Sequence, residues 1–196
     1  MAVSGFDIAV FAGDGIGPEI MTPTLEILRG LALASPEYEL RFHALPAGAA
    51  HYRNTGDALP EQSLATARET DASLLAAMGL PDVRYSDGTE ISPQIELRKA
   101  LQLFAGIRPV RVKTGQACPL SLPAGHEIEF VLIRESTEGL FFSQGAGVVT
   151  EDEARETLLI TRDISEKLFR FAFDLARDRK QAGRGPGRVT CVDKAN

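Results

Sequence analysis

The sequence predicts an α/β fold, in which a parallel or mixed β-sheet is flanked by helices. Apolar runs of strand length, such as residues 7–11 and 72–79, alternate with segments whose apolar residues follow helical periodicity. A glycine-rich turn directly follows the first run, at the point where a strand of such a fold leads into a helix. Because ligands gather at the carboxyl ends of the strands in α/β sheets, we expect functional residues at these turns.

The first turn reads GDGIGPE at residues 13–19. Glycine allows positive φ angles and close approach of a ligand to the backbone, and proline suits the first turn of a helix. The turn is not the dinucleotide pattern GxGxxG, because its third glycine comes one residue early. A ligand loop and a plain tight turn are both consistent with it. We expect the next helix to begin near Thr22 or Pro23.

Two further strands and a helix are expected before residue 80. Apolar and polar side chains alternate at residues 38–43, which predicts a half-exposed strand with His43 pointing outward. A helix is expected over residues 59–70, followed by a buried parallel strand at residues 72–79. We assign no role to any of the three histidines, because none has a partner at metal-ligand spacing.

Three arginines are candidates for binding a small polycarboxylic acid. Residues 97–104 have helical periodicity with Gly106 as a terminator, which places Arg98 on a helix. Pro109 restrains Arg108 to an extended conformation, and Arg134 ends a buried apolar run. Arginine can clamp a carboxylate with two parallel hydrogen bonds. The alternative is that each is a solvated or ion-paired surface arginine.

The second half of the chain is expected to contain a long connection, a short strand and a helix. Residues 115–125 carry proline and glycine, residues 157–161 alternate as a strand does, and helical periodicity begins at Asp163. Residues 188–193 look like a strand at which the sequence stops. Because a complete α/β domain would not normally end on an uncovered strand, we expect this sequence to be incomplete.

Composition excludes several classes of protein. The formal net charge of -6 argues against a general nucleic-acid binder. No apolar run approaches the ~20 residues needed to cross a bilayer, and the first residues lack the features of a secretory signal. The two cysteines have no metal or redox spacing. We expect a cytoplasmic protein that binds neither nucleic acid nor membrane.

Six short motifs occur together in a characteristic order. They are GDGIGPE at 13–19, LRK at 97–99, IRP at 107–109, IRE at 133–135, TEG at 137–139 and VDKAN at 192–196. In this order the chain resembles the metal-dependent β-decarboxylating dehydrogenases, which act on isopropylmalate, isocitrate, homoisocitrate or tartrate. The resemblance implies a two-domain fold, truncated at the C-terminus. Residues 1–100 would belong to the first, cofactor-side domain, and residues 101–196 to the second, with a dimerisation arm.

The resemblance also implies roles for individual residues. Arg98, Arg108 and Arg134 would bind the carboxylates of a (2R)-malate-type acid. Lys194 would be the catalytic base, donated across a homodimer interface. The cofactor would be bound by Gly13, Gly15, Ile16, Gly17 and Asn196. The implied reaction oxidises the C2 hydroxyl by hydride transfer to NAD, or to NADP, and removes CO₂. The implied Mg²⁺ or Mn²⁺ would have its ligands beyond residue 196, so we assign no metal ligand.

Two positions bear on substrate and mechanism within the resemblance. Ser92 and Gln94 take the places at which isocitrate enzymes recognise a polar substituent, whereas isopropylmalate enzymes favour leucine there. Phe141 stands where most members have a proton-donating tyrosine. Two interpretations of Phe141 are open. The protein could be a divergent enzyme in which water or Lys194 supplies that proton, or an enzyme that decarboxylates poorly. A non-catalytic or regulatory paralogue, which binds a metabolite or a partner subunit, is the alternative function. A bare α/β binding module is a third.

Overall fold

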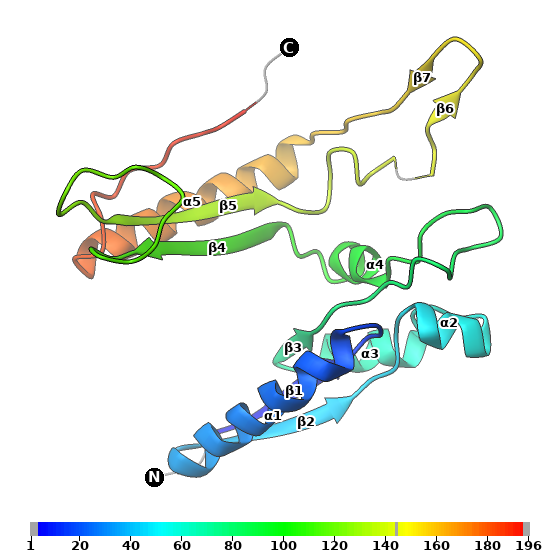
Figure 1. Cartoon of the computed structure of the whole chain (residues 1–196), viewed down its shortest axis with the longest axis horizontal. Coiled ribbons are helices and arrows are strands. Elements are labelled where there is room, and N and C mark those ends of the chain that lie inside the picture. The colour runs from blue at the N-terminus through cyan, green and yellow to red at the C-terminus, as the bar shows by residue number, and fades with distance from the viewer. Residues whose placement is uncertain (1–3, 144, 194–196) are drawn as a thin grey trace. The chain divides into compact units, whose positions relative to one another are not determined.

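The computed structural model describes residues 4–143 and 145–193. The chain divides into two compact units, Met1–Leu101 and Gln102–Asn196. Both units mix helices and strands, as the sequence predicts, and Figure 1 labels their elements.

A three-stranded parallel sheet forms the centre of the first unit. Its strands are β1 (Ser4–Phe11), β2 (Tyr38–Ala44) and β3 (Ala72–Leu75), in the order β2-β1-β3. Val10 of β1 is in register with Ala44 on one side and Leu74 on the other. The carboxyl ends of all three strands therefore lie at one edge of the sheet, and the loops that follow them gather there.

Four helices complete the first unit: α1 (Gly17–Ala34), α2 (Ala49–Thr55), α3 (Glu61–Glu69) and α4 (Pro93–Ala100). α1 begins five residues earlier than the predicted Thr22, because Pro18 occupies its first turn, where a missing N–H costs nothing. It lies along β2 (Figure 1), and the Arg29 guanidinium stands 5.5 Å from the centroid of the Phe42 ring.

Two small apolar clusters form the core of the first unit. The cluster beneath the sheet contains Ala9 and Phe11 of β1, Ala67 of α3 and Leu97 of α4. The other cluster joins α2 to the long β3–α4 loop and includes the nearly inaccessible Ile91. α4 is therefore fixed to the sheet through Leu97, and the loop that precedes it is packed against α2 through Ile91.

Two further expectations for the first unit are wrong. β3 ends at Leu75, and three of its four residues are exposed, because it is an edge strand rather than a buried one. The helix expected over residues 97–104 runs instead from Pro93 to Ala100. Pro93 fits the first turn, which the apolar periodicity could not indicate. Gly106 does not end the helix but belongs to the next strand, where a Cβ would approach Ser136 Oγ to 2.9 Å.

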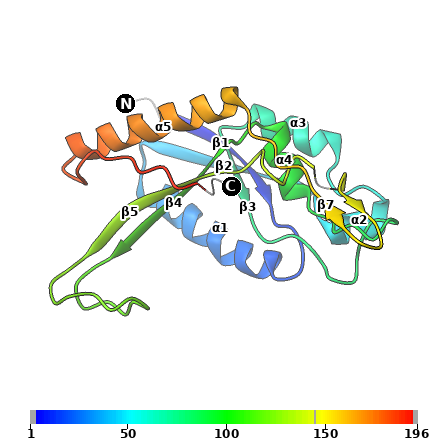
Figure 2. The same ribbon diagram turned by 90° about the horizontal axis from the view of Figure 1, so that it is seen from above.

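The second unit is built on an antiparallel hairpin and one long helix. β4 (Ala105–Val112) pairs with β5 (Ile128–Glu135), β6 (Val148–Val149) pairs with β7 (Ala154–Arg155), and α5 spans Arg162–Gln181. Figure 2 shows α5 and the β4–β5 hairpin from above. Arg179 of α5 donates to Glu129 of β5 at 2.8 Å, which joins the helix to the hairpin.

Two strands expected in the second unit do not form. Within residues 157–161 only an isolated bridge between Leu159 and Gly139 is present. The described residues 188–193 contain no strand. A strand requires a neighbour for its N–H and C=O groups, and none lies beside residues 188–193 in the part of the chain that the structure describes.

Candidate functional site

The β1–α1 loop contains four of the predicted cofactor-binding residues. Gly13 and Gly15 have φ angles of 69° and 58°, which favour glycine. A Cβ atom on Gly13 or on Gly17 would collide with the carbonyl oxygen of Ala77, in the segment after β3. The close packing of two backbone segments therefore accounts for Gly13 and Gly17, without any ligand.

Gly15 and Ile16 face outward from this loop. The nearest atoms to a Cβ built on Gly15 are 3.8 Å away, and Ile16 is 59% exposed. A ligand at the carboxyl edge of the sheet would meet these two residues rather than Gly13 or Gly17. The packing thus accounts for Gly13 and Gly17 as a tight turn, and the ligand-loop interpretation of Gly15 and Ile16 stays a prediction.

A carboxylate that the sequence did not single out holds this loop in place. Asp14 is 4% exposed, and its two carboxylate oxygens accept N–H groups from Gly79 and Ala50, at 2.7 Å and 3.0 Å. The only sequence signal for it was its place within the glycine-rich turn.

α4 carries three of the predicted substrate-binding residues. Ser92 is its buried N-cap residue, and its hydroxyl makes no capping hydrogen bond. Gln94 and Arg98 are four residues apart and therefore share one face of the helix. The buried Oε1 atom of Gln94 has no hydrogen-bond partner among the described residues. An unsatisfied buried acceptor costs about 1–3 kcal/mol, so a donor supplied by a ligand would relieve this cost.

Two tyrosines fix the loop that leads into α4. The rings of Tyr52 and Tyr85 meet edge to face, with centroids 5.0 Å apart. The Tyr85 hydroxyl donates to Glu96 of α4 at 3.4 Å. Burial, and then the neighbouring Glu96 carboxylate, raise the pKa of Tyr85 above its usual value. Tyr85 is therefore a protonated donor that ties the loop to the helix.

Arg108 and Arg134 lie on the same face of the β4–β5 hairpin. Arg108 is opposite Leu132, and Arg134 is opposite Gly106, so the two arginines are diagonal neighbours across the strands. Both are exposed, and no carboxylate lies within 4.0 Å of either guanidinium in the described residues. The Arg134 guanidinium stands 5.4 Å from the centroid of the Phe141 ring. Arg111, on the opposite face, pairs with Glu129 at 3.5 Å.

Two glutamates order the chain directly after Arg134. The Glu135 carboxylate accepts the Thr137 hydroxyl at 2.6 Å and the Glu138 N–H at 3.0 Å. The Glu138 carboxylate accepts both the N–H and the hydroxyl of Thr161, at 2.8 Å and 2.6 Å. Thr161 is the N-cap residue of α5. The segment that carries Phe141 is thereby tied to the start of α5.

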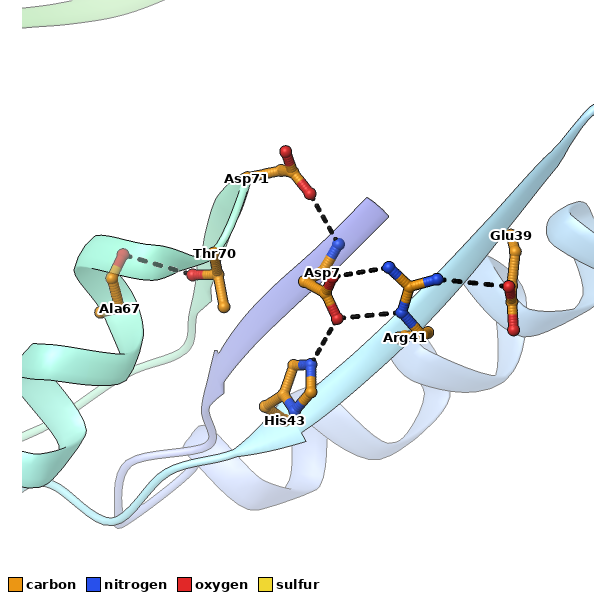
Figure 3. A network of polar contacts seen from close by, with 7 residues as sticks. All are labelled: Asp7, Glu39, Arg41, His43, Ala67, Thr70 and Asp71. Carbon is orange, nitrogen blue, oxygen red and sulfur yellow. Dashed lines mark hydrogen bonds and ion pairs between the residues drawn. The ribbon is translucent and has the colours of Figure 1, made fainter. Parts of the chain in front are cut away.

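An ion-pair network on the sheet of the first unit lies away from these loops (Figure 3). The Asp7 carboxylate of β1 contacts Arg41 Nη2 at 2.6 Å and His43 Nε2 at 2.7 Å, both on β2. Hydrogen bonds from Arg41, and then from His43, hold the pKa of Asp7 well below its usual range. His43 is thus partnered rather than simply solvated. The network joins the middle of β1 to β2, from Arg41 at the centre of β2 to His43 near its carboxyl end.

Two predicted residues, Lys194 and Asn196, lie outside the described residues. Among residues 4–143 and 145–193, no group of three His, Cys, Asp or Glu side chains is placed to hold a metal ion. In the same residues, no helix combines the length and apolar character of a membrane span.

Comparison with known proteins identifies relatives of this chain. A sequence model described as isocitrate/isopropylmalate dehydrogenase matches residues 7–196. A 3-isopropylmalate/3-methylmalate dehydrogenase of Methanocaldococcus jannaschii is 38% identical over 96% of this chain and 51% of its own length. A 3-isopropylmalate dehydrogenase of Geobacillus kaustophilus is 36% identical over 99% and 52%. The chain therefore spans about half the length of these curated relatives.

Solved structures give the same match at the level of the fold. An isocitrate dehydrogenase from Methylococcus capsulatus superposes with a TM-score of 0.71 at 28% identity, covering 89% of this chain and 48% of that one. A β-decarboxylating dehydrogenase from Thermococcus kodakarensis, in its apo form, gives 0.57 at 28% identity, covering 89% and 46%.

Proposed function

The chain belongs to the isocitrate/isopropylmalate dehydrogenase family. We therefore propose that the protein oxidises the C2 hydroxyl of a (2R)-malate-type acid. The C2 hydride would pass to NAD or NADP, and loss of CO₂ would follow with the help of Mg²⁺ or Mn²⁺. The metal ligands are expected beyond residue 196, and we assign no step to the metal.

The observation that carries this proposal is the pair Arg108 and Arg134. Both guanidiniums lie on one hairpin face without a carboxylate partner among the described residues, whereas Arg111 on the other face is paired. Two unpaired guanidiniums on one face suit a ligand with more than one carboxylate, and arginine remains protonated at neutral pH. We propose that Arg98 supplies the third such contact.

We also propose a role for each of the remaining predicted residues. Gly15 and Ile16 would contact the nicotinamide nucleotide, with Gly13 and Gly17 shaping the loop, and Asn196 would lie near the carboxamide. Lys194 would accept the C2 proton, because a cationic environment favours the neutral form of a lysine. We propose that residues 1–100 form the cofactor-side domain, and that residues 101–196 form part of the second domain with its dimerisation arm. We further propose a cytoplasmic homodimer.

Gln94 bears on the choice of substrate. Its amide oxygen has no hydrogen-bond partner among the described residues, and the Ser92 hydroxyl makes no capping hydrogen bond. Both observations favour a substrate with a polar substituent at C3. A site built for a hydrogen bond rejects a substrate that lacks the donor more strongly than an apolar pocket rejects a missing methylene. Tartrate, whose C3 hydroxyl can donate to the Gln94 oxygen, would then be preferred to isopropylmalate, although the curated relatives above are named for isopropylmalate. The extra carboxylate of isocitrate only accepts, so it would instead need a donor such as the Ser92 hydroxyl.

Reduction of the nicotinamide tests the proposal. The full-length protein, meaning these 196 residues with any others its gene encodes, would be supplied with Mn²⁺ and NAD or NADP. It would then be offered isocitrate, isopropylmalate, tartrate and malate in turn. Turnover with one of these acids is expected, and absence of turnover with all of them contradicts the proposal.

A second candidate is a non-catalytic paralogue that binds a metabolite or a partner subunit. The observation that favours it is Phe141, whose ring beneath Arg134 carries no hydroxyl for proton transfer. Calorimetric titration with the same four acids distinguishes the two functions. Binding without turnover, in both the unaltered protein and Phe141→Tyr, would support the second candidate.

A further inference from the structure

Asp14 connects its own loop to two other segments of the first unit. Its Oδ1 accepts the Gly79 N–H at 2.7 Å, after β3, and its Oδ2 accepts the Ala50 N–H at 3.0 Å, at the start of α2. The partners are 65 and 36 residues away in sequence. One side chain therefore connects the loops that follow all three strands of the sheet.

The backbone around Asp14 reinforces this connection. The Asp14 N–H donates to the Ala77 carbonyl at 3.1 Å, and the Asp14 carbonyl accepts the Gly17 N–H at 2.9 Å. A Cβ on Gly48 would collide with Asp14 Oδ2, so the β2–α2 loop approaches the carboxylate as closely as a glycine permits. Both the side chain and the main chain of Asp14 thus hold the loop that bears Gly15 and Ile16.

The Asp14 carboxylate depends on these N–H groups. It is 4% exposed, and no Lys, Arg or His side chain lies within 4.0 Å of it in the described residues. A buried charge without a counter-ion is strongly unfavourable unless it is hydrogen-bonded. Bonds from N–H groups to a carboxylate are stronger than neutral ones. Removing the charge should therefore release the loops from one another rather than weaken one contact.

We infer that Asp14 is a positioning residue, which fixes the 13–17 loop against the loops after β2 and β3 and thereby sets the geometry of the cofactor pocket. The part that concerns the cofactor rests on the proposed function. Asp14 itself points into the protein, away from the outward-facing Gly15 and Ile16, and so acts on the ligand only through the loop.

The test uses Asp14→Asn in the full-length protein, with Asp57→Asn as the matched control. Asn has nearly the same shape, but its amide NH₂ would face one of the two N–H donors. Asp57 also accepts a backbone N–H, from Leu59 at 3.0 Å, but only within its own loop. Amide hydrogen exchange is measured over peptides containing Ala50 and Gly79, and KM for the nucleotide, KM for the acid and kcat are measured separately.

We expect faster exchange at both peptides in Asp14→Asn and a KM for the nucleotide raised about tenfold, the ratio worth 1.4 kcal/mol. KM for the acid and kcat should change by less than about twofold, because the proposed acid-binding arginines are not on these loops. A general loss of structure would instead change both KM values and kcat. Asp57→Asn should match the unaltered protein. If Asp14→Asn fails to fold, nucleotide addition to the unaltered protein replaces it, and should slow exchange at the Ala50 peptide.

The outcomes separate this inference from the proposed function. Unchanged exchange at Ala50 and Gly79, or equal effects on the two KM values, would overturn the inference while leaving the function intact. In the measurement on the unaltered protein, nucleotide binding that does not change hydrogen exchange at the Ala50 peptide would also overturn the inference and leave the function intact. An unaltered protein that binds neither NAD nor NADP would overturn the proposed function and the cofactor part of the inference together.

Discussion

Arg134→Ala separates a role in binding from a role in stability. In the described residues, the Arg134 side chain has no ion pair, and its one charged interaction is with the Phe141 ring, at 5.4 Å. An exposed cation–π contact contributes about 0.5–1 kcal/mol, so the free energy of unfolding should fall by no more than about this amount. The melting temperature of the variant should therefore stay close to that of the unaltered protein.

The effect on the substrate should be much larger. A hydrogen bond to a charged group contributes about 1.5–3 kcal/mol, which corresponds to about a 10- to 150-fold loss in kcat/KM. Steady-state kinetics with the accepted acid measure this loss, and chemical denaturation measures the stability. The matched control is Arg111→Ala, in β4 on the opposite face of the same hairpin and paired with Glu129 at 3.5 Å. Unchanged kcat/KM in Arg134→Ala, or an equal loss in Arg111→Ala, would refute the assignment.

Three further predictions concern the first unit. Leu97→Ala should lower the free energy of unfolding by about 2–5 kcal/mol, measured by urea denaturation, because Leu97 is 4% exposed within the core. Gly48→Ala should cost about 1–3 kcal/mol in the same assay, because its φ is 115° and its Cβ would meet Asp14 Oδ2; a neutral result would contradict the packing described. The lowered pKa of Asp7 means that its contribution to stability is complete above the usual carboxyl pKa of about 3.9 and is lost as the pH falls below it. Asp7→Asn should therefore flatten the acid side of a plot of stability against pH, and an unchanged slope would argue against the network with His43.

Local patterns were sufficient for the parallel sheet and for its loops. The apolar run at β1, the glycine-rich turn and the alternation at β2 each specify an element without reference to distant residues, and all three elements form. The same reasoning located β3 but wrongly predicted that it is buried: three of its four residues are exposed, because burial depends on what covers an edge strand. It also failed for residues 188–193, because an extended sequence does not reveal whether a neighbouring strand is present.

The candidate site was predictable only in part, for a similar reason. Arg98, Arg108 and Arg134 were recognisable as residue types suited to carboxylates, but the shared face of Arg108 and Arg134 follows from the β4–β5 register, which sequence patterns do not fix. The role of Asp14 was hidden because its partners, Ala50 and Gly79, contribute only backbone N–H groups. Any residue type other than proline could supply those donors.

The stacking of Arg134 on Phe141 gives this protein a built-in position for an optical reporter. The 196 residues contain no tryptophan, so Phe141→Trp would introduce the first indole among them, beneath a guanidinium. Indole fluorescence responds to the charge next to the ring, and a carboxylate that draws Arg134 away would change that charge. Emission from the indole at position 141 would then follow occupancy of the proposed acid-binding face in real time, before any hydride has moved.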